Sequence, residues 1–153
     1  MRILLVEDEE AKARHVATFI GQLLPHAQLT TARSVRSAMA SLLKEVPDLL
    51  ILDMSLPTFD ISSTESGGRP QGFGGLELMR NMELEEIACP TIVLTGYEAF
   101  NKSGGQISLD ALNAELAAEY PETFKGLFHY NSAYGDWQDR LRAVVGGIEI
   151  SEP

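Results

Sequence analysis

DLLILDMSLP, residues 48–57, contains an unbroken apolar run from Leu49 to Leu52 that ends on Asp53. Four consecutive apolar residues between polar neighbours are typical of a strand that is buried on both faces of a parallel sheet. Similar runs occur at Ile3–Val6, Thr91–Leu94 and Gly126–Tyr130, and residues 27–32, AQLTTA, are a weaker candidate. The sequence therefore predicts five strands, one of which finishes on a carboxylate.

Apolar residues at helical spacing fill the segments between these runs. The stripes are Val16, Phe19, Ile20 and Leu23; Val35, Ala38, Met39, Leu42 and Val46; Leu76, Met79 and Met82; Leu109, Leu112 and Leu116; and Trp137, Leu141, Val144, Val145 and Ile148. Alternation of buried strands with helices predicts a single α/β domain over residues 1–153, a doubly wound parallel (βα)5 sheet with helices on both faces.

Two segments interrupt this alternation. Residues 58–72, TFDISSTESGGRPQG, are rich in Ser, Thr and Gly without clear periodicity, and they predict an inserted loop after the third strand. Residues 96–106, GYEAFNKSGGQ, form a second irregular stretch, so the connection after the fourth strand is also enlarged. Long loops in compact domains are often functional, so the first segment is interpreted as a lid or a docking surface, with an ornamental loop as the alternative.

Composition excludes several classes of protein. The 153 residues carry a net charge of −10, which argues against binding to nucleic acid or to an anionic membrane. Cys89 is the single cysteine, so an intramolecular disulfide and a cysteine-based zinc site are excluded. No signal peptide or run of about 20 apolar residues is present, and we expect a cytoplasmic protein without membrane insertion.

Acidic and small polar residues follow three of the predicted strands. Glu7 and Asp8 follow the first, Asp53 the third, and Thr95 with Gly96 the fourth. The carboxyl ends of parallel strands share one edge of the sheet, where ligands bind. Three carboxylates there repel one another unless a cation neutralises them, and oxygen ligands without His or Cys favour Mg²⁺.

The expected Mg²⁺ ligands are Asp8 and Asp53, with Glu7 directly or through water and the backbone carbonyl of Ser55. A metal-bound Asp53 is a candidate nucleophile towards phosphorus, which gives an aspartyl phosphate. The Thr95 hydroxyl is then placed to bond a phosphoryl oxygen, and Gly96 leaves room for the donor. The bland alternatives are helix capping by Glu7 and Asp8, a turn role for Asp53 and an ordinary strand position for Thr95.

LLVEDE, LLILDMSLP and IVLTG, in this order and spacing, resemble the receiver domains of two-component response regulators over nearly the whole chain. The resemblance implies a flavodoxin-like strand order 2-1-3-4-5. It implies that Glu7 and Asp8 bind Mg²⁺, that Asp53 is the phosphoacceptor and that Thr95 is the switch residue. It also implies a histidine kinase or phosphotransfer protein as phosphoryl donor and a downstream protein partner.

One part of the family pattern is missing. Receivers carry a Lys followed by Pro after the fifth strand, and this Lys contacts the phosphoryl group. Residues 126–137 read GLFHYNSAYGDW, which places Tyr130 or Asn131 at that position. The candidate substitutes are the cations Arg69 and Lys102, from the two enlarged loops, and the neutral side chains of Tyr130, Asn131 and His129.

The expected function is that of a stand-alone receiver in a phosphorelay, which accepts a phosphoryl group but is not otherwise an enzyme. The alternative is a receiver-like module that binds proteins without phosphorylation, a hypothesis that the missing Lys supports. A phosphatase of the haloacid dehalogenase type is disfavoured because Ser55 stands where a second Asp is needed. A flavodoxin-like nucleotide binder is disfavoured because acids, not a Gly-rich phosphate cradle, follow the first strand.

Overall fold

The computed structural model describes residues 1–59, 74–97, 99–102, 105–133 and 135–151, without the side chains of 99–102, 105 and 149–151. Most of the predicted inserted loop, residues 58–72, therefore lies outside the described residues. No helix in the described part of the chain is both long enough and apolar enough to cross a lipid bilayer.

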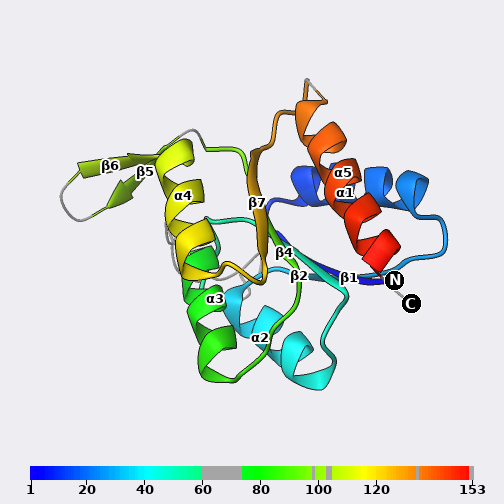
Figure 1. The fold of residues 1–153 in the computed structure, drawn as a ribbon, viewed down its shortest axis with the longest axis horizontal. Helices are drawn as coiled ribbons and strands as arrows, with labels where there is room; N and C mark the ends of the chain where they lie inside the picture. The colour runs from blue at the N-terminus through cyan, green and yellow to red at the C-terminus, as the bar shows by residue number, and fades with distance from the viewer. Residues whose placement is uncertain (60–73, 98, 103–104, 134, 152–153) are drawn as a thin grey trace, which may run out of the picture.

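Five parallel strands form one sheet in the order β2-β1-β3-β4-β7 (Figure 1). Their bounds are β1 Arg2–Val6, β2 Gln28–Ala32, β3 Leu49–Leu52, β4 Thr91–Thr95 and β7 Phe124–His129. The fold class and strand order predicted from the sequence are confirmed. The last strand of the sheet carries the number seven only because two short strands precede it.

Helices cover both faces of the sheet. They are α1 Glu10–Leu23, α2 Val35–Lys44, α3 Gly74–Leu84, α4 Leu109–Glu119 and α5 Asp136–Ser151. Figure 1 shows α1 and α5 together on one face, with α2, α3 and α4 on the other. The five predicted apolar stripes lie on these five helices, with one exception: Val46, predicted to belong to the second stripe, follows the end of α2 at Lys44 and is exposed.

Side chains alternate between two hydrophobic clusters because successive residues of a strand point to opposite faces. In β3, Leu49 and Ile51 join the cluster with α1 and α5, while Leu50 and Leu52 join the cluster with α2, α3 and α4. All four side chains are fully buried. Because both faces of β3 are buried, all four residues of the run Leu49–Leu52 are apolar.

The last strand differs from its predicted range, Gly126–Tyr130. β7 begins two residues earlier, and its pairing with β4 shifts register between Thr91 and Ile92, which leaves Lys125 as the extra residue of a bulge. Gly126 follows with φ of +144°, a conformation that favours glycine. The extra residue interrupts the regular strand pattern, so the sequence pattern alone does not predict Phe124 and Lys125 as part of the strand.

Within the stretch 96–106, predicted to be irregular, a β-hairpin begins that extends to Ser108. β5 Ala99–Lys102 pairs antiparallel with β6 Gly105–Ser108, and Ser108 then caps α4 by accepting a hydrogen bond from the Ala111 N–H at 3.2 Å. Figure 1 shows the hairpin projecting from the body beside α4. Hydrogen bonding between two short strands with little apolar character is a weak signal in a sequence.

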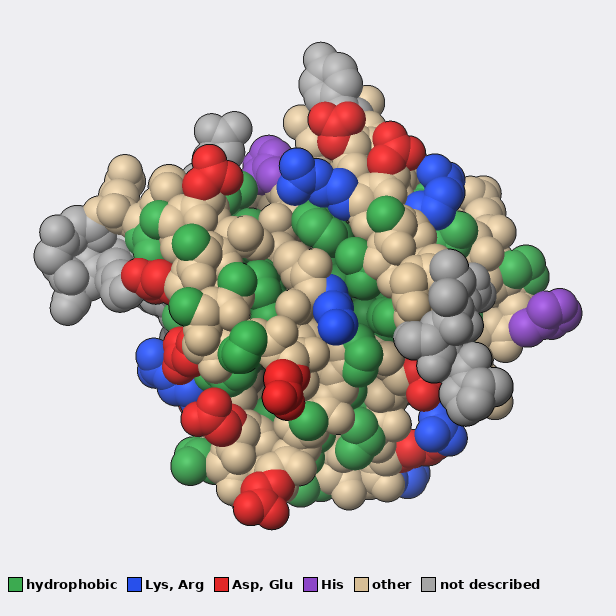
Figure 2. All heavy atoms as spheres, viewed as in Figure 1, with side chains coloured by type: hydrophobic (Ala, Val, Ile, Leu, Met, Phe, Trp, Pro, Cys, Tyr) green, Lys and Arg blue, Asp and Glu red, His purple; other side chains and the backbone are tan. Residues whose placement is uncertain are grey.

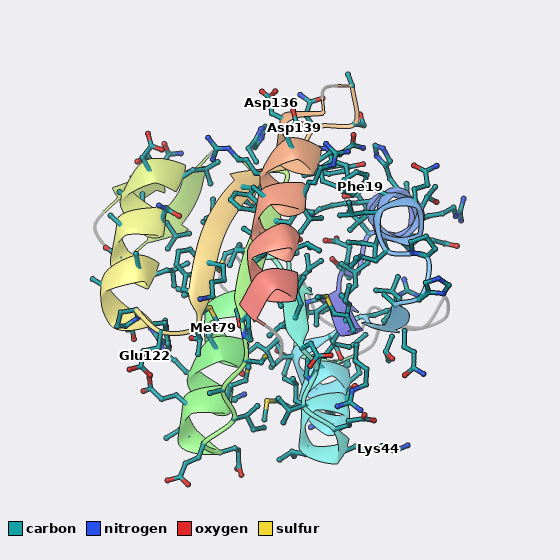
Figure 3. The ribbon with its side chains drawn as sticks, turned by 45° about the vertical axis from the view of Figure 1, so that its right-hand side comes forward. Phe19, Lys44, Met79, Glu122, Asp136 and Asp139 are labelled. Atoms are coloured by element: carbon teal, nitrogen blue, oxygen red, sulfur yellow. The ribbon has the colours of Figure 1, made fainter. Side chains whose placement is uncertain are left out.

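The net charge of −10 reflects an excess of acidic over basic side chains. Figure 2 shows Asp and Glu side chains spread over the face that it presents, including the region around α3 and α4. Figure 3 shows Phe19 on α1 pointing towards α5, where its ring centroid lies 5.4 Å from that of Trp137. This aromatic contact joins α1 to α5 within the hydrophobic cluster on their face of the sheet.

Candidate functional site

Three carboxylates meet at the carboxyl edge of the sheet. β1 and β3 are parallel neighbours, and the Asp53 N–H donates to the Val6 carbonyl at 3.0 Å, so both strands end at the same level. Each of Glu7, Asp8 and Asp53 offers a carboxylate oxygen, and these oxygens lie within 4.8 Å of one another. The convergence predicted from the sequence is confirmed.

The acidic group is largely shielded from water. Glu7 and Asp53 are 5% and 6% exposed, and Asp8 is half-buried. Burial raises the pKa of the Glu7 carboxyl to about 7, against the opposing effect of Lys12 and with a further rise from Asp53. Burial, followed by the charge of Asp53, also raises the pKa of the Asp8 carboxyl. Carboxyl groups with raised pKa values in one cluster favour the binding of a cation.

Lys12, from the first turn of α1, lies among these acids. Its Nζ lies 2.8 Å from Glu7 Oε2 and 3.3 Å from Asp53 Oδ1, and it donates to the Leu94 carbonyl at 2.7 Å. The side chain is only 3% exposed. Sequence reasoning missed this residue, although one signal was present: a cation in the first turn of a helix opposes the helix dipole, where acids are the rule.

The two oxygens of the Asp53 carboxylate have different surroundings. Oδ1 accepts a hydrogen bond from the Met54 N–H at 2.8 Å and contacts Lys12. Among the described residues, no hydrogen-bond donor contacts Oδ2. The side chain is thus held in place through one oxygen, while the other is available to a ligand.

Thr95 and Gly96 follow β4 at the same edge. Thr95 is fully buried, and its Oγ1 accepts a hydrogen bond from the Tyr97 N–H at 3.3 Å. A Cβ added to Gly96 would meet no atom within 4 Å, so this glycine faces open space. A cavity of about 230 Å³ adjoins the acids and Lys12, with Ser55, Gly96 and Tyr97 in its walls.

The glycine pair that opens α3 supports the acceptor loop from behind. A Cβ on Gly75 would lie 2.6 Å from the Asp53 carbonyl oxygen, and one on Gly74 would lie 2.2 Å from that of Leu56. The Gly75 N–H donates to the Met54 carbonyl at 2.8 Å. Backbone packs directly on backbone here, which explains why two glycines stand at this position.

Of the predicted substitutes for the missing Lys, three bond to groups other than the acids, and two have side chains outside the described residues. The Tyr130 hydroxyl is 2.7 Å from His15 Nδ1, and the Asn131 side chain accepts from the Ala133 N–H at 2.7 Å, so neither is bonded to the acids. His129 Nε2 lies 3.3 Å from the Gly96 carbonyl. Arg69 lies outside the described residues, as does the side chain of Lys102, whose backbone belongs to β5.

The donor set suits a hard divalent cation. Only oxygen ligands are present in the cluster, with the unbonded Asp53 Oδ2 and the half-buried Asp8 carboxylate beside the cavity. Carboxylate and carbonyl oxygens are the ligands that Mg²⁺ prefers, since it keeps several waters and uses few protein groups. The residues therefore fit such an ion, and Lys12 offsets only part of their charge.

No protein-family model matches the chain. Among curated proteins, it is 27% identical over 144 residues to the uncharacterized protein y4jR of Sinorhizobium fredii, across 93% of this chain and 95% of that one. It is 26% identical over 143 residues to the Detocs response regulatory protein DtcB of Enterobacter cloacae, across 92% of this chain and 95% of the relative.

Solved structures of similar shape are receiver domains. The non-phosphorylated HemR receiver domain of Leptospira biflexa superposes with a TM-score of 0.64 and 20% identity, over 99% of this chain and 97% of that one. A CheY-like receiver domain of Methylobacillus flagellatus superposes with a TM-score of 0.61 and 17% identity, over 97% of this chain and 98% of that one. The chain therefore has the fold of response regulator receiver domains, and its acidic cluster lies at the carboxyl edge of the sheet, where open α/β sheets bind their ligands.

Proposed function

We propose that the protein is a response regulator receiver that accepts a phosphoryl group on Asp53 with Mg²⁺ bound at the acidic cluster. The observation that carries this proposal is the convergence of the Glu7, Asp8 and Asp53 carboxylates within 4.8 Å beside an open cavity. Glu7, Asp8, Asp53 and the Ser55 carbonyl would hold the ion. When bound, Mg²⁺ supplies positive charge that stabilises the phosphoryl oxygens during transfer.

The chemistry assigned to Asp53 is nucleophilic attack by its free Oδ2 on the phosphorus of a phosphohistidine. The new O–P bond forms as the P–N bond breaks, and the electron pair of that bond stays on the imidazole, which takes up a proton from water. The Met54 N–H holds Oδ1 in place, so the attacking oxygen is oriented without a further rearrangement. A histidine kinase or a phosphotransfer protein would supply the phosphohistidine.

Signalling would pass through Thr95 and the segment that follows it. A phosphoryl oxygen on Asp53 would accept a hydrogen bond from the Thr95 hydroxyl, and rotation of Thr95 towards that oxygen would break the hydrogen bond that Oγ1 now accepts from the Tyr97 N–H. Such an exchange would bias the connection from β4 to the hairpin between two conformations. A downstream protein partner would then distinguish the two, on a surface that includes α4.

The test is intact mass spectrometry after incubation with acetyl phosphate and Mg²⁺. We expect one phosphoryl mass on the wild type, none on Asp53→Asn and none when the metal is chelated. Asp110→Asn is the matched control because it removes an exposed carboxylate from α4, away from the acidic cluster. Retained labelling of Asp53→Asn would contradict the assignment of the acceptor.

A second function, a receiver-like module that binds a partner without phosphorylation, draws on two specific observations. The Lys12 ammonium already neutralises part of the acidic cluster, and the Thr95 hydroxyl is hydrogen-bonded rather than exposed in the cavity wall. A titration with beryllofluoride, an analogue of the acyl phosphate, discriminates the two functions. Mg²⁺ binding without any beryllofluoride binding or labelling would favour the binding module.

A further inference from the structure

The position of Lys12 is energetically unfavourable, so it needs a structural or functional reason. It is a buried cation at the positive end of a helix, so both desolvation and the helix dipole act against it. Its Nζ has three oxygen neighbours, on Glu7, Asp53 and the Leu94 carbonyl, which is as many as an ammonium group has hydrogens to donate. These partners lie at the carboxyl ends of β1, β3 and β4, so the ammonium lies at the centre of the candidate site.

The chain after β7 places a neutral aromatic residue, Tyr130, at the same site. The Tyr130 N–H donates to the Thr95 carbonyl at 2.7 Å, which puts Tyr130 next to the end of β4. Its ring centroid lies 5.5 Å from Lys12 Nζ, and its hydroxyl lies 2.7 Å from His15 on the following turn of α1. Tyr130, the first residue after β7, thus packs against Lys12 without supplying a cation of its own.

The net negative charge of the three carboxylates explains why the site needs the Lys12 ammonium. When all are ionised, the three carboxylates and Lys12 leave two uncompensated negative charges. Phosphorylation of Asp53 replaces a single negative charge with about two. A divalent metal with Lys12 then balances most of the site, whereas the metal alone leaves a larger excess in a partly dry cavity.

We propose that Lys12 is the phosphoryl-contact residue of this protein, supplied by α1 in place of a Lys after the last strand. The inference rests on the proposed phosphorylation of Asp53. Of the three contacts of Nζ, the one to Asp53 Oδ1 is the longest, at 3.3 Å, and is the one exchanged for a phosphoryl oxygen. The ammonium keeps its proton throughout and acts as a charged hydrogen-bond donor.

With acetyl phosphate as donor, the step balances as follows. An Asp53 carboxylate oxygen forms a bond to phosphorus while the bond from phosphorus to the acetyl oxygen breaks, and acetate leaves with the electron pair. Lys12 stabilises the charge on the phosphoryl oxygens in the transition state and in the acyl phosphate. It should therefore affect both the labelling rate and the affinity for beryllofluoride.

The experiment compares Lys12→Met with Lys44→Met, a control at the end of α2 whose side chain points away from the body (Figure 3). For Lys12→Met we expect labelling by acetyl phosphate and affinity for beryllofluoride to fall about tenfold or more. Mg²⁺ affinity of the unphosphorylated protein should stay the same or rise, because a competing cation has been removed. Lys44→Met should match the wild type in all three measurements.

The double variant Lys12→Met with Tyr130→Lys returns the cation to the chain after β7. It keeps the wild-type net charge and leaves a cation beside the acids. It therefore remains a test even if the single variant fails to fold. Its labelling rate should lie within about threefold of the wild type. Wild-type labelling and beryllofluoride affinity in Lys12→Met would overturn the inference, as would a double variant that binds Mg²⁺ but is not labelled. If the wild type itself binds Mg²⁺ yet shows neither labelling nor beryllofluoride binding, the proposed function fails and this inference with it.

Discussion

At the scale of single residues, the site balances like charges against one cation. Glu7 lies 2.8 Å from Lys12 and still has a raised pKa, because its burial outweighs this favourable contact. A carboxyl group that resists ionisation in the folded protein stores unfavourable free energy at neutral pH. A bound metal ion would stabilise the ionised carboxylate, so metal binding should raise the free energy of unfolding.

The pH dependence of stability follows from the same residue. The Glu7 pKa is 4.5 in the absence of its folded environment and about 7 in it, so the native state binds the proton more tightly between these values. The free energy of unfolding of the metal-free protein should therefore fall as pH rises from about 4.5 to 7. Urea unfolding in the presence of a chelator, at pH 5 and pH 8, measures this difference.

Glu7→Gln is the informative variant, since an amide does not titrate. We expect it to lose less stability than the wild type over the same pH interval. Asp8, whose pKa is also raised, contributes in the same direction and leaves a residual slope. An equally steep decline in both proteins would show that Glu7 is not its source.

At the scale of elements, the start of α3 determines the position of the acceptor. Gly75 lets the helix approach the backbone of Asp53 more closely than any Cβ would allow. Gly75→Ala should therefore displace the acceptor loop and lower stability by about 1–3 kcal/mol, as overpacking does. We expect labelling of Asp53 to slow by about tenfold or more, because small displacements of a nucleophile cost much of its rate.

Gly21→Ala is the matched control for this prediction. Gly21 lies within α1, and a Cβ there meets no atom within 4 Å. Alanine should stabilise the helix by about 0.5–1 kcal/mol and leave labelling unchanged. Denaturant unfolding measures the change in stability of the two variants, and intact mass spectrometry measures their labelling. A Gly75→Ala protein that behaves like Gly21→Ala would contradict the role given to Gly75.

At the scale of the whole molecule, the net charge of −10 and the acidic cluster act together on metal binding. A ligand that binds only the native state at 100 times its Kd adds about 2.7 kcal/mol to the free energy of unfolding. For a domain of this size, Tm rises by about 2–4 °C per kcal/mol, so saturating Mg²⁺ should raise it by about 5–10 °C. Thermal unfolding with added Mg²⁺ measures this rise.

Potassium chloride at equal ionic strength separates site binding from general screening of the acidic surface. Asp8→Asn should lose most of the Mg²⁺-dependent rise while it keeps the response to potassium chloride. If both salts raise Tm equally in both proteins, the metal acts on the surface as a whole and not on the cluster.

Much of this protein can be inferred from local sequence pattern. Apolar runs of strand length and helical stripes alternate along the chain, and a parallel sheet built this way must bring Glu7, Asp8 and Asp53 to one edge. These features depend on the period of side chains and on the direction of parallel strands, both of which a sequence displays.

Other features depend on tertiary packing, which joins residues distant in sequence. Lys12 and Leu94 are 82 positions apart, and their contact arises because α1 packs on the face of the sheet that β1, β3 and β4 help to form. In the sequence Lys12 resembles any solvated helix cation, whereas in the fold its flexible side chain reaches into the acidic cluster. The proposal that Arg69 or Lys102 supplies a cation stays a prediction, because Arg69 and the side chain of Lys102 lie outside the described residues. Helix packing, which brings Lys12 to the acids, leaves no mark in the local sequence pattern.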